Sequence, residues 1–180
     1  LLKKFIIGGA GYTPVAISDI LQTLNLGQLP FLEELDVRNF PLTSINAEYC
    51  PRLKKVLATG SSLTQITLAE TSPINELSLP NTMTNLSFIN LPNLTYPNGN
   101  LTLGSCANVT RLQVIGCPGI DDIALLHKVV VTNSAPLHDI RLIDVDVTSD
   151  KTLLTKMKTL GVIGVGSTET GKCDGITGRW

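Results

Sequence analysis

The stretch 32–70, LEELDVRNFPLTSINAEYCPRLKKVLATGSSLTQITLAE, decides the fold of this chain because an L-x-x-L-x-L pattern recurs along it at nearly constant spacing. Within it the pattern begins at Leu32, Leu42, Leu53 and Leu63. Over the wider chain the starts from Leu21 to Ile74 lie 11, 10, 11, 10 and 11 residues apart, so the full period is 21 residues in two similar halves. A fixed period of roughly 20 to 50 residues indicates stacked repeats. We therefore predict a solenoid of parallel coils with two short strands in each.

The pattern also predicts which side chains face the interior. The second and third apolar positions are two residues apart, so on a strand they point to the same side. One coil cannot bury this stripe alone, but stacked coils make a continuous core. After an interruption that begins at Leu94, the frame returns at Leu101 and Leu103, then at Val109, Leu112 and Val114, and last at Ile120, Ile123 and Leu125, beyond which it weakens. The residues between the inward positions are expected to face outward as a candidate contact surface: Asn25, Asp36, Asn46, Leu57, Thr67, Ser78, Ser87, Thr102 and Gln113.

The segment Leu94 to Asn100 interrupts the spacing and contains Tyr-Pro-Asn-Gly-Asn. We predict that it bulges out as a loop. Loops on a regular scaffold often carry contacts, which adds Tyr96 and Asn98 to the candidate surface. An insertion tolerated at a solenoid corner is the favoured explanation of the loop, because long surface loops cost little stability.

The 180 residues, 43% of them hydrophobic, suit a single domain. We assign 1–20 to an opening strand and turn, 21–127 to repeats, and 128–180 to a C-terminal cap and exit strand. The cap is predicted as a strand over 139–147, a helix over about 149–160 and a final strand. Because the sequence begins at Leu1 and ends at Trp180 within an expected strand, we expect it to be excised from a longer chain.

Composition argues against several partners. Charged residues make up 16% and the net charge is −1, so nucleic acid is not expected to bind. The apolar runs are too short to span a bilayer, which argues against membrane insertion. The glycines after Phe5–Ile7 lack the Gly-Lys-Ser/Thr of a phosphate loop, and Pro14 stands where a dinucleotide motif needs its last glycine. We interpret Gly8–Gly11 as a tight turn and expect no cofactor.

Cysteine and histidine do not suggest a metal site. Cys50, Cys106 and Cys117 each lie eight positions after a frame start, where a small side chain turns into the core. Cys173 has no such assignment. The chain has no C-x-x-C, and the histidines, 127 and 138, lie outside the frame, so zinc is not expected.

The acidic residues do not suggest calcium or catalysis either. Asp144, Asp146 and Asp150 depart from the calcium-loop spacing and suit strand ends and a helix cap better. His138 beside Asp139 is the one candidate for a hydrolytic pair, but neighbours on a strand point to opposite faces. We expect no catalytic residue and no enzyme activity.

The run from Leu32 to Ile123 resembles the leucine-rich-repeat superfamily, whose architecture is the α/β horseshoe class, here mostly β. The phrases LEELDVRN (32–39), SLPNTMTNLSFINLPNLT (78–95) and NVTRLQVIGCPGID (108–121) are similar to irregular repeats in large virion and tail-associated proteins of gut Bacteroidales phages. The segment 138–165 looks like the strand, helix and strand that close those arrays. One departure concerns the asparagine ladder typical of the superfamily, which is replaced by Phe40, Ser61, Thr71, Thr82 and Leu91.

The resemblance implies contact with protein or glycan but carries over no binding residue. Our first hypothesis is a non-enzymatic structural or interaction module of a phage virion or tail, contacting protein subunits or a host surface. The second is a bacterial cell-surface or secreted adhesin that binds a host protein or glycan. The third is a scaffold beside a catalytic domain outside this sequence. The expected location is the virion or the extracellular surface.

Overall fold

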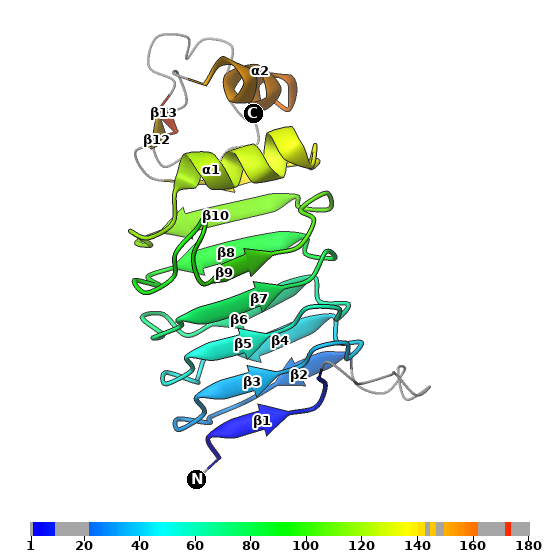
Figure 1. The fold of residues 1–180 in the computed structure, drawn as a ribbon, viewed down its shortest axis with the longest axis vertical. Coiled ribbons are helices and arrows are strands. Elements are labelled where there is room, and N and C mark those ends of the chain that lie inside the picture. Colours follow the sequence, from blue (N-terminus) through cyan, green and yellow to red (C-terminus); the bar gives the residue numbers. More distant parts are fainter. Residues whose placement is uncertain (1, 10–21, 143–144, 147–149, 162–171, 174–180) are drawn as a thin grey trace.

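The computed structural model describes residues 2–9, 22–142, 145–146, 150–161 and 172–173. These residues form a parallel β-solenoid with five coils of two strands each (Figure 1). The strands are β1 (Lys4–Ile6), β2 (Thr23–Asn25), β3 (Glu34–Asp36), β4 (Ser44–Ala47), β5 (Lys55–Leu57), β6 (Gln65–Leu68), β7 (Glu76–Leu79), β8 (Asn85–Ile89), β9 (Leu101–Leu103) and β10 (Arg111–Ile115). The predicted parallel coils with two strands in each are confirmed.

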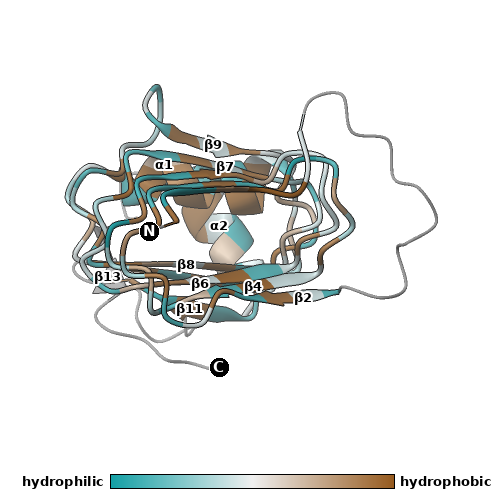
Figure 2. Ribbon diagram, turned by 90° about the horizontal axis from the view of Figure 1, so that it is seen from below, coloured by the Kyte–Doolittle hydropathy of each residue, from teal (hydrophilic) through white to brown (hydrophobic). Residues whose placement is uncertain are grey.

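Alternate strands lie on opposite sides of the solenoid. The odd-numbered strands form one sheet in the order β1-β3-β5-β7-β9, which we call the first side. The other side, the second side, carries two sheets, β2-β4-β6 and β8-β10-β11, where β11 is Asp139–Arg141. Figure 2 looks along the solenoid and shows the strands of the two sides as two layers.

Coil length varies along the chain. Paired residues are 21 apart between β3 and β5, β5 and β7, β2 and β4, and β4 and β6. The separation is 30 between β1 and β3, 24 between β7 and β9, 26 between β8 and β10, and 28 between β10 and β11. The average is therefore about 24, and the 21-residue period describes the regular coils only. The remaining coils are longer, and residues 10–21 of the longest one lie outside the described residues.

The predicted inward positions fill the interior. On the first side, Leu35, Val56 and Leu77 are paired in register and fully buried. On the second side, Ile45 and Ile66 are paired in the same way and are 2% and 9% exposed. Burying each such side chain contributes roughly 1.5–3 kcal/mol, so the stacked apolar stripe is the main source of stability.

Charged side chains alternate in sign along the outer face of the first side. Lys4, Glu34, Lys55 and Glu76 occupy the same position in successive strands. The Nζ of Lys4 lies 2.8 Å from Glu34, and that of Lys55 lies 2.7 Å from Glu76. Since a one-residue slip would separate these partners, the alternation favours the observed register.

A column of threonines performs a similar role on the second side. The hydroxyls of Thr43 and Thr64 donate to the carbonyls of Gln22 and Thr43, each over 3.0 Å. Those of Thr84 and Thr110 donate to the carbonyls of Thr64 and Thr84, over 3.3 and 3.2 Å. Each threonine thus adds a side-chain bond to the backbone bonds between coils.

The prediction that the repeat frame continues at Ile120, Ile123 and Leu125 is wrong. The chain instead forms α1 (Asp122–Leu126), which runs directly into the π-helix η1 (His127–Thr132). Asp121 caps the helix, its carboxylate accepting from the backbone N–H of Ala124 over 3.0 Å. Apolar positions three residues apart also suit a helix. Here the capping aspartate starts the helix, and the buried pairs 125–126 and 129–130 form its inner face.

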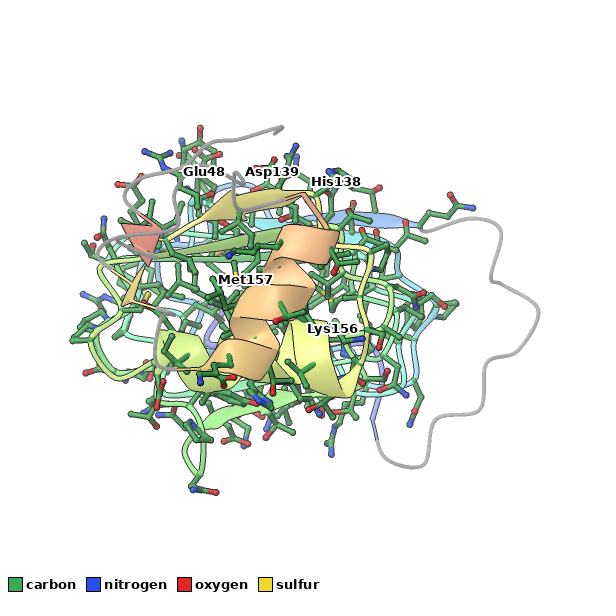
Figure 3. The ribbon with its side chains drawn as sticks, turned by 90° about the horizontal axis from the view of Figure 1, so that it is seen from above. Glu48, His138, Asp139, Lys156 and Met157 are labelled. Carbon is green, nitrogen blue, oxygen red and sulfur yellow. The ribbon has the colours of Figure 1, made fainter. Side chains whose placement is uncertain are left out.

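The helix predicted over about 149–160 is present as α2 (Lys151–Thr159). The carboxylate of Asp150 accepts from the N–H of Leu153 over 2.9 Å, as its predicted capping role requires. Leu153 and Met157 are buried, and Figure 3 shows α2 crossing the C-terminal end of the solenoid. The expected strand over 139–147 is divided into β11 and β12 (Val145–Asp146), which pairs antiparallel with β13 (Lys172–Cys173). The final turn and strand predicted over 162–165 and 175–180 lie outside the described residues.

Candidate functional site

The sequence-predicted contact residues do not form one surface. Asp36, Leu57, Ser78 and Thr102 follow one another on the first side. Asn25, Asn46, Thr67, Ser87 and Gln113 lie on the second side. Because each coil has two strands on opposite sides, outward residues ten or eleven apart alternate between two separate faces.

Two of these residues are not exposed as expected. Asp36 is 4% exposed and Ser78 is 9% exposed. The Nη2 and Nε of Arg38 lie 2.7 and 3.0 Å from the carboxylate of Asp36 and cover it. The hydrogen bond from Arg38 also lowers the pKa of Asp36 below its usual value. The hydroxyl of Ser78 accepts from that of Thr59 over 3.1 Å, so both residues have structural partners.

The predicted loop is confirmed as an irregular segment between β8 and β9. Asn100 closes it, since its side-chain oxygen accepts from Thr95 N over 2.8 Å and its amide donates to the Asn93 carbonyl over 2.8 Å. Tyr96 is half-buried against the core, and this burial raises its pKa. Asn98 is exposed, so of the two proposed loop contacts Asn98 is the more accessible.

The second side is interrupted between β6 and β8. Thr84 follows Thr64 by 20 residues where the preceding members of the column are 21 apart. The N–H groups of Thr84 and Asn85 both donate to the Thr64 carbonyl, over 3.0 and 3.2 Å. Beyond this point the two strands belong to different sheets. The shortened coil thus coincides with an opening in the outer face.

A hollow of about 450 Å³ occupies this opening. Four of its polar lining residues come from the two strands: Gln65 and Thr67 from β6, and Asn85 and Ser87 from β8. Its apolar lining consists of Ile66, Leu68, Ile89 and Leu91. Leu68 borders the hollow and is therefore half-buried. Its equivalents Ala47, one coil earlier, and Phe88, one coil later, are buried.

A second hollow of about 380 Å³ adjoins the first at the corner that follows β2, β4 and β6. Its lining includes Gln28, Pro30, Pro51 and Ala69. Both hollows are lined by Glu48, Tyr49 and Glu70. We call the two together the trough. Tyr49 stands at their junction with 54% of its surface exposed, and Gln28 and Glu70 are its equivalents one coil before and after it.

Several polar side chains around the trough have no partner among the described residues, although the Ser87 hydroxyl donates to the side-chain oxygen of Gln113 over 3.3 Å. This holds for five of them: Glu48, Tyr49, Gln65, Thr67 and Glu70. On the first side, in contrast, Glu33, Glu34 and Glu76 are each ion-paired with a lysine within 2.8 Å. Unused acceptors and donors therefore collect at the trough, where they are available to a ligand.

The other candidate groups have structural roles. Cys50, Cys106 and Cys117 are buried, as predicted. They are not joined in disulfides, and burial raises the pKa of each thiol. Burial keeps these thiols protonated and unreactive. Gly8 packs so close to the backbone at Arg38 that a side chain would not fit, and the Gly9 N–H donates to the Arg38 carbonyl over 2.8 Å. These two glycines therefore continue the pairing with the next coil, and the rest of the predicted turn lies outside the described residues.

Three of the candidate positions near the C-terminus, His127, Asp139 and Asp150, have side-chain partners, whereas His138 is exposed. His127 Nε2 lies 3.4 Å from Asp150, and Asp139 lies 2.6 Å from Arg111 Nε. Within the described part of the chain, no three His, Cys, Asp or Glu side chains are grouped as a metal would require. Asp144, Ala10, Gly11 and Pro14 lie outside the described residues, as do the side chains of Asp146 and Cys173.

Sequence reasoning named Thr67 and Ser87 but missed the other polar groups of the trough. The signal that could have revealed it is the spacing of 9 residues between the frame starts Ile74 and Met83, where 10 or 11 is the rule. Tyr49, at the corner between two frames, has no place in the repeat pattern and could have drawn attention for that reason.

None of the helices in the described residues is long and apolar enough to cross a membrane. Comparison of the chain with protein-family models, with curated proteins and with solved structures found no match.

Proposed function

We propose that this chain is a non-enzymatic interaction module that binds another molecule through the trough on its second side. The observation that carries the proposal is the contrast in side-chain pairing. Glutamates of the first side are bound to lysines, whereas Glu48 and Glu70 at the trough have no partner among the described residues. Clefts with an apolar lining and a few convergent polar groups are the usual form of a ligand site.

We further propose that the solenoid is of the leucine-rich-repeat type and belongs to a phage virion or tail-associated protein. The L-x-x-L-x-L frames and the phrases similar to phage proteins support this origin. In this view α1, η1 and α2 cover the last coil, since the end of a solenoid needs a polar covering. Fold alone does not determine function, so the binding role rests on the trough.

The alternatives differ in what surrounds this chain. A bacterial surface adhesin would use the same trough toward a host protein or glycan. A scaffold beside a catalytic domain would leave chemistry to residues outside 1–180. The three described thiols are buried, Asp36 and Asp139 are ion-paired, and Asp121 and Asp150 cap helices, which supports a non-catalytic role here.

Binding of the fluorescently labelled chain to intact gut Bacteroidales cells and to purified virions tests the contact role. We expect saturable binding that a combined Glu48→Gln, Tyr49→Ala and Glu70→Gln variant loses. A matched variant on the first side, Glu33→Gln with Glu76→Gln, should bind like the wild type. Equal loss in both variants, or none in the first, would exclude the trough as the contact site.

A further inference from the structure

We propose that the trough binds an uncharged oligosaccharide chain that lies across the strands, with one sugar ring stacked on Tyr49. This inference rests on the proposed function and adds the class of ligand and its orientation. Three features carry it: the direction of the trough, the exposed tyrosine ring, and the kinds of polar group beside it.

The trough runs across the coils and not along a strand. It extends from Gln28 and Pro30, after β2, past Tyr49 to Asn85 and Ser87 on β8. Those elements belong to four successive coils, which at an inter-strand spacing of about 4.8 Å span roughly 14 Å along the solenoid. A peptide added to a sheet edge must run parallel to the strands to form its backbone hydrogen bonds. A ligand running across the strands must instead be held by side chains.

The side chains present suit a sugar. Tyr49 exposes 54% of its surface and offers a flat apolar ring face with a polar tip, which suits the C–H face of a pyranose. Carboxylates such as Glu48 and Glu70 can each accept two hydrogen bonds from neighbouring hydroxyl groups. The Gln65 amide and Thr67 hydroxyl can both donate and accept, as sugar hydroxyls also do.

The charge of the trough narrows the ligand class. Glu48 and Glu70 are exposed, and neither hollow has a lysine or arginine among its described lining residues. Arg52, one residue from Pro51, has its guanidinium over the Phe31 ring at 5.0 Å from the ring centre. An acidic polysaccharide or a phosphorylated ligand would therefore be repelled. A basic peptide could pair with the carboxylates, and the experiment separates it from an uncharged sugar.

The test is calorimetric titration of the chain 1–180 with a panel of named probes. The uncharged probes are maltohexaose, cellohexaose, xylohexaose, mannohexaose and N-acetylated chitohexaose. Polygalacturonate and hexalysine are the acidic and basic comparisons. We expect at least one uncharged hexasaccharide to bind up to millimolar concentration, polygalacturonate not to bind, and binding to persist at high salt, since uncharged ligands are little affected by screening.

Variants locate the binding. Tyr49→Ala should weaken binding roughly tenfold through the lost stacking, whereas Tyr49→Phe, which keeps the ring, should retain most of it. Ile6→Ala, which removes a similarly exposed apolar side chain from β1, is the matched control and should not change the affinity. Thermal melting by circular dichroism shows whether each variant keeps the wild-type fold.

Three results would overturn this proposal. No binding of any hexasaccharide excludes an uncharged sugar. Salt-sensitive binding of hexalysine alone, lost in Glu48→Gln, assigns the trough to basic peptides. Hexasaccharide binding that Tyr49→Ala leaves unchanged places the site elsewhere. In each case retained binding to cells or virions would leave the contact role standing, so the two proposals fail separately.

Discussion

Asp36 faces outward on its strand but is buried under Arg38, so its substitution should lower the free energy of unfolding more than that of an exposed acidic residue. Its carboxylate lies 2.7 Å from Arg38 Nη2 and 3.0 Å from Arg38 Nε, and it accepts from the Arg38 N–H over 3.1 Å. Its side chain is 6% exposed. Hydrogen bonds to charged groups contribute about 1.5–3 kcal/mol when shielded. Asp36→Asn removes the charge and turns an NH₂ toward the guanidinium, so we expect the free energy of unfolding to fall by about 1–3 kcal/mol.

Glu34→Gln is the matched control on the same strand. Glu34 Oε1 lies 2.8 Å from Lys4 Nζ, which is similar to the Asp36–Arg38 distance. The Glu34 side chain is 26% exposed and that of Lys4 is 52% exposed. Exposed ion pairs contribute about 0–1 kcal/mol because water and salt screen them. Comparison of the two variants therefore separates the effect of burial from the effect of removing an acidic group.

Urea unfolding of the wild type and both variants measures these differences, with similar slopes expected because each change leaves the buried surface nearly constant. The pH dependence gives a second check. Arg38 lowers the pKa of Asp36 in the folded state, so the stability that the pair contributes is present above the unfolded value near ~3.9. It is lost as pH falls through the lower folded value. A cost for Glu34→Gln equal to that of Asp36→Asn, or a cost independent of pH, would refute the reasoning.

Three further predictions follow from the C-terminal helices and the core. Burial and Asp121 raise the pKa of Asp122 to about 6, and its Oδ1 is buried without a partner among the described residues. Ionised Asp122 thus destabilises the fold, and Asp122→Asn should add on the order of 1 kcal/mol above pH 6, allowing for partial solvent exposure. This gain should disappear below about pH 4 in urea titrations, and a pH-independent gain would contradict it. Removal of the α2 cap by Asp150→Ala should cost about 1 kcal/mol and speed amide exchange in α2, with unchanged exchange as the contrary result. Peptide mapping after alkylation should find Cys50, Cys106 and Cys117 protected until urea is added, whereas early labelling would place them outside the core.

Most of the fold could be predicted because its signals are local. The repeat frame, the inward stripe and the three buried cysteines depend on positions within one coil, and the structure confirms them. Asp150 and the apolar positions that follow it likewise indicate α2 from nearby residues. The frame at Ile120 was misleading because three-residue apolar spacing suits a helix as well as a strand, and the cap at Asp121 favours the helix.

The candidate site could be predicted only in part. The repeat pattern predicts that Thr67 and Ser87 face outward. Tyr49 lies at a corner, and it lines the trough because the corners of the coils before and after it lie beside it. Neighbours across coils are about 21 residues apart in the chain, and their contact depends on the lengths of all the corners between them. The coil between Thr64 and Thr84 is one residue shorter than the preceding one, and the outer face opens at this coil.

The sequence by itself determined the solenoid, its two strands per coil and the identity of the core, since strand alternation and the apolar period act over a few residues. Only the tertiary structure decided which outward residues are buried, as Asp36 is under Arg38, and which remain free, as Glu48 and Glu70 do. The physical reason is that hydrogen bonds and ion pairs between coils depend on register. Register depends on the lengths and conformations of all the corners between two paired strands, and the sequence of a single repeat does not specify these.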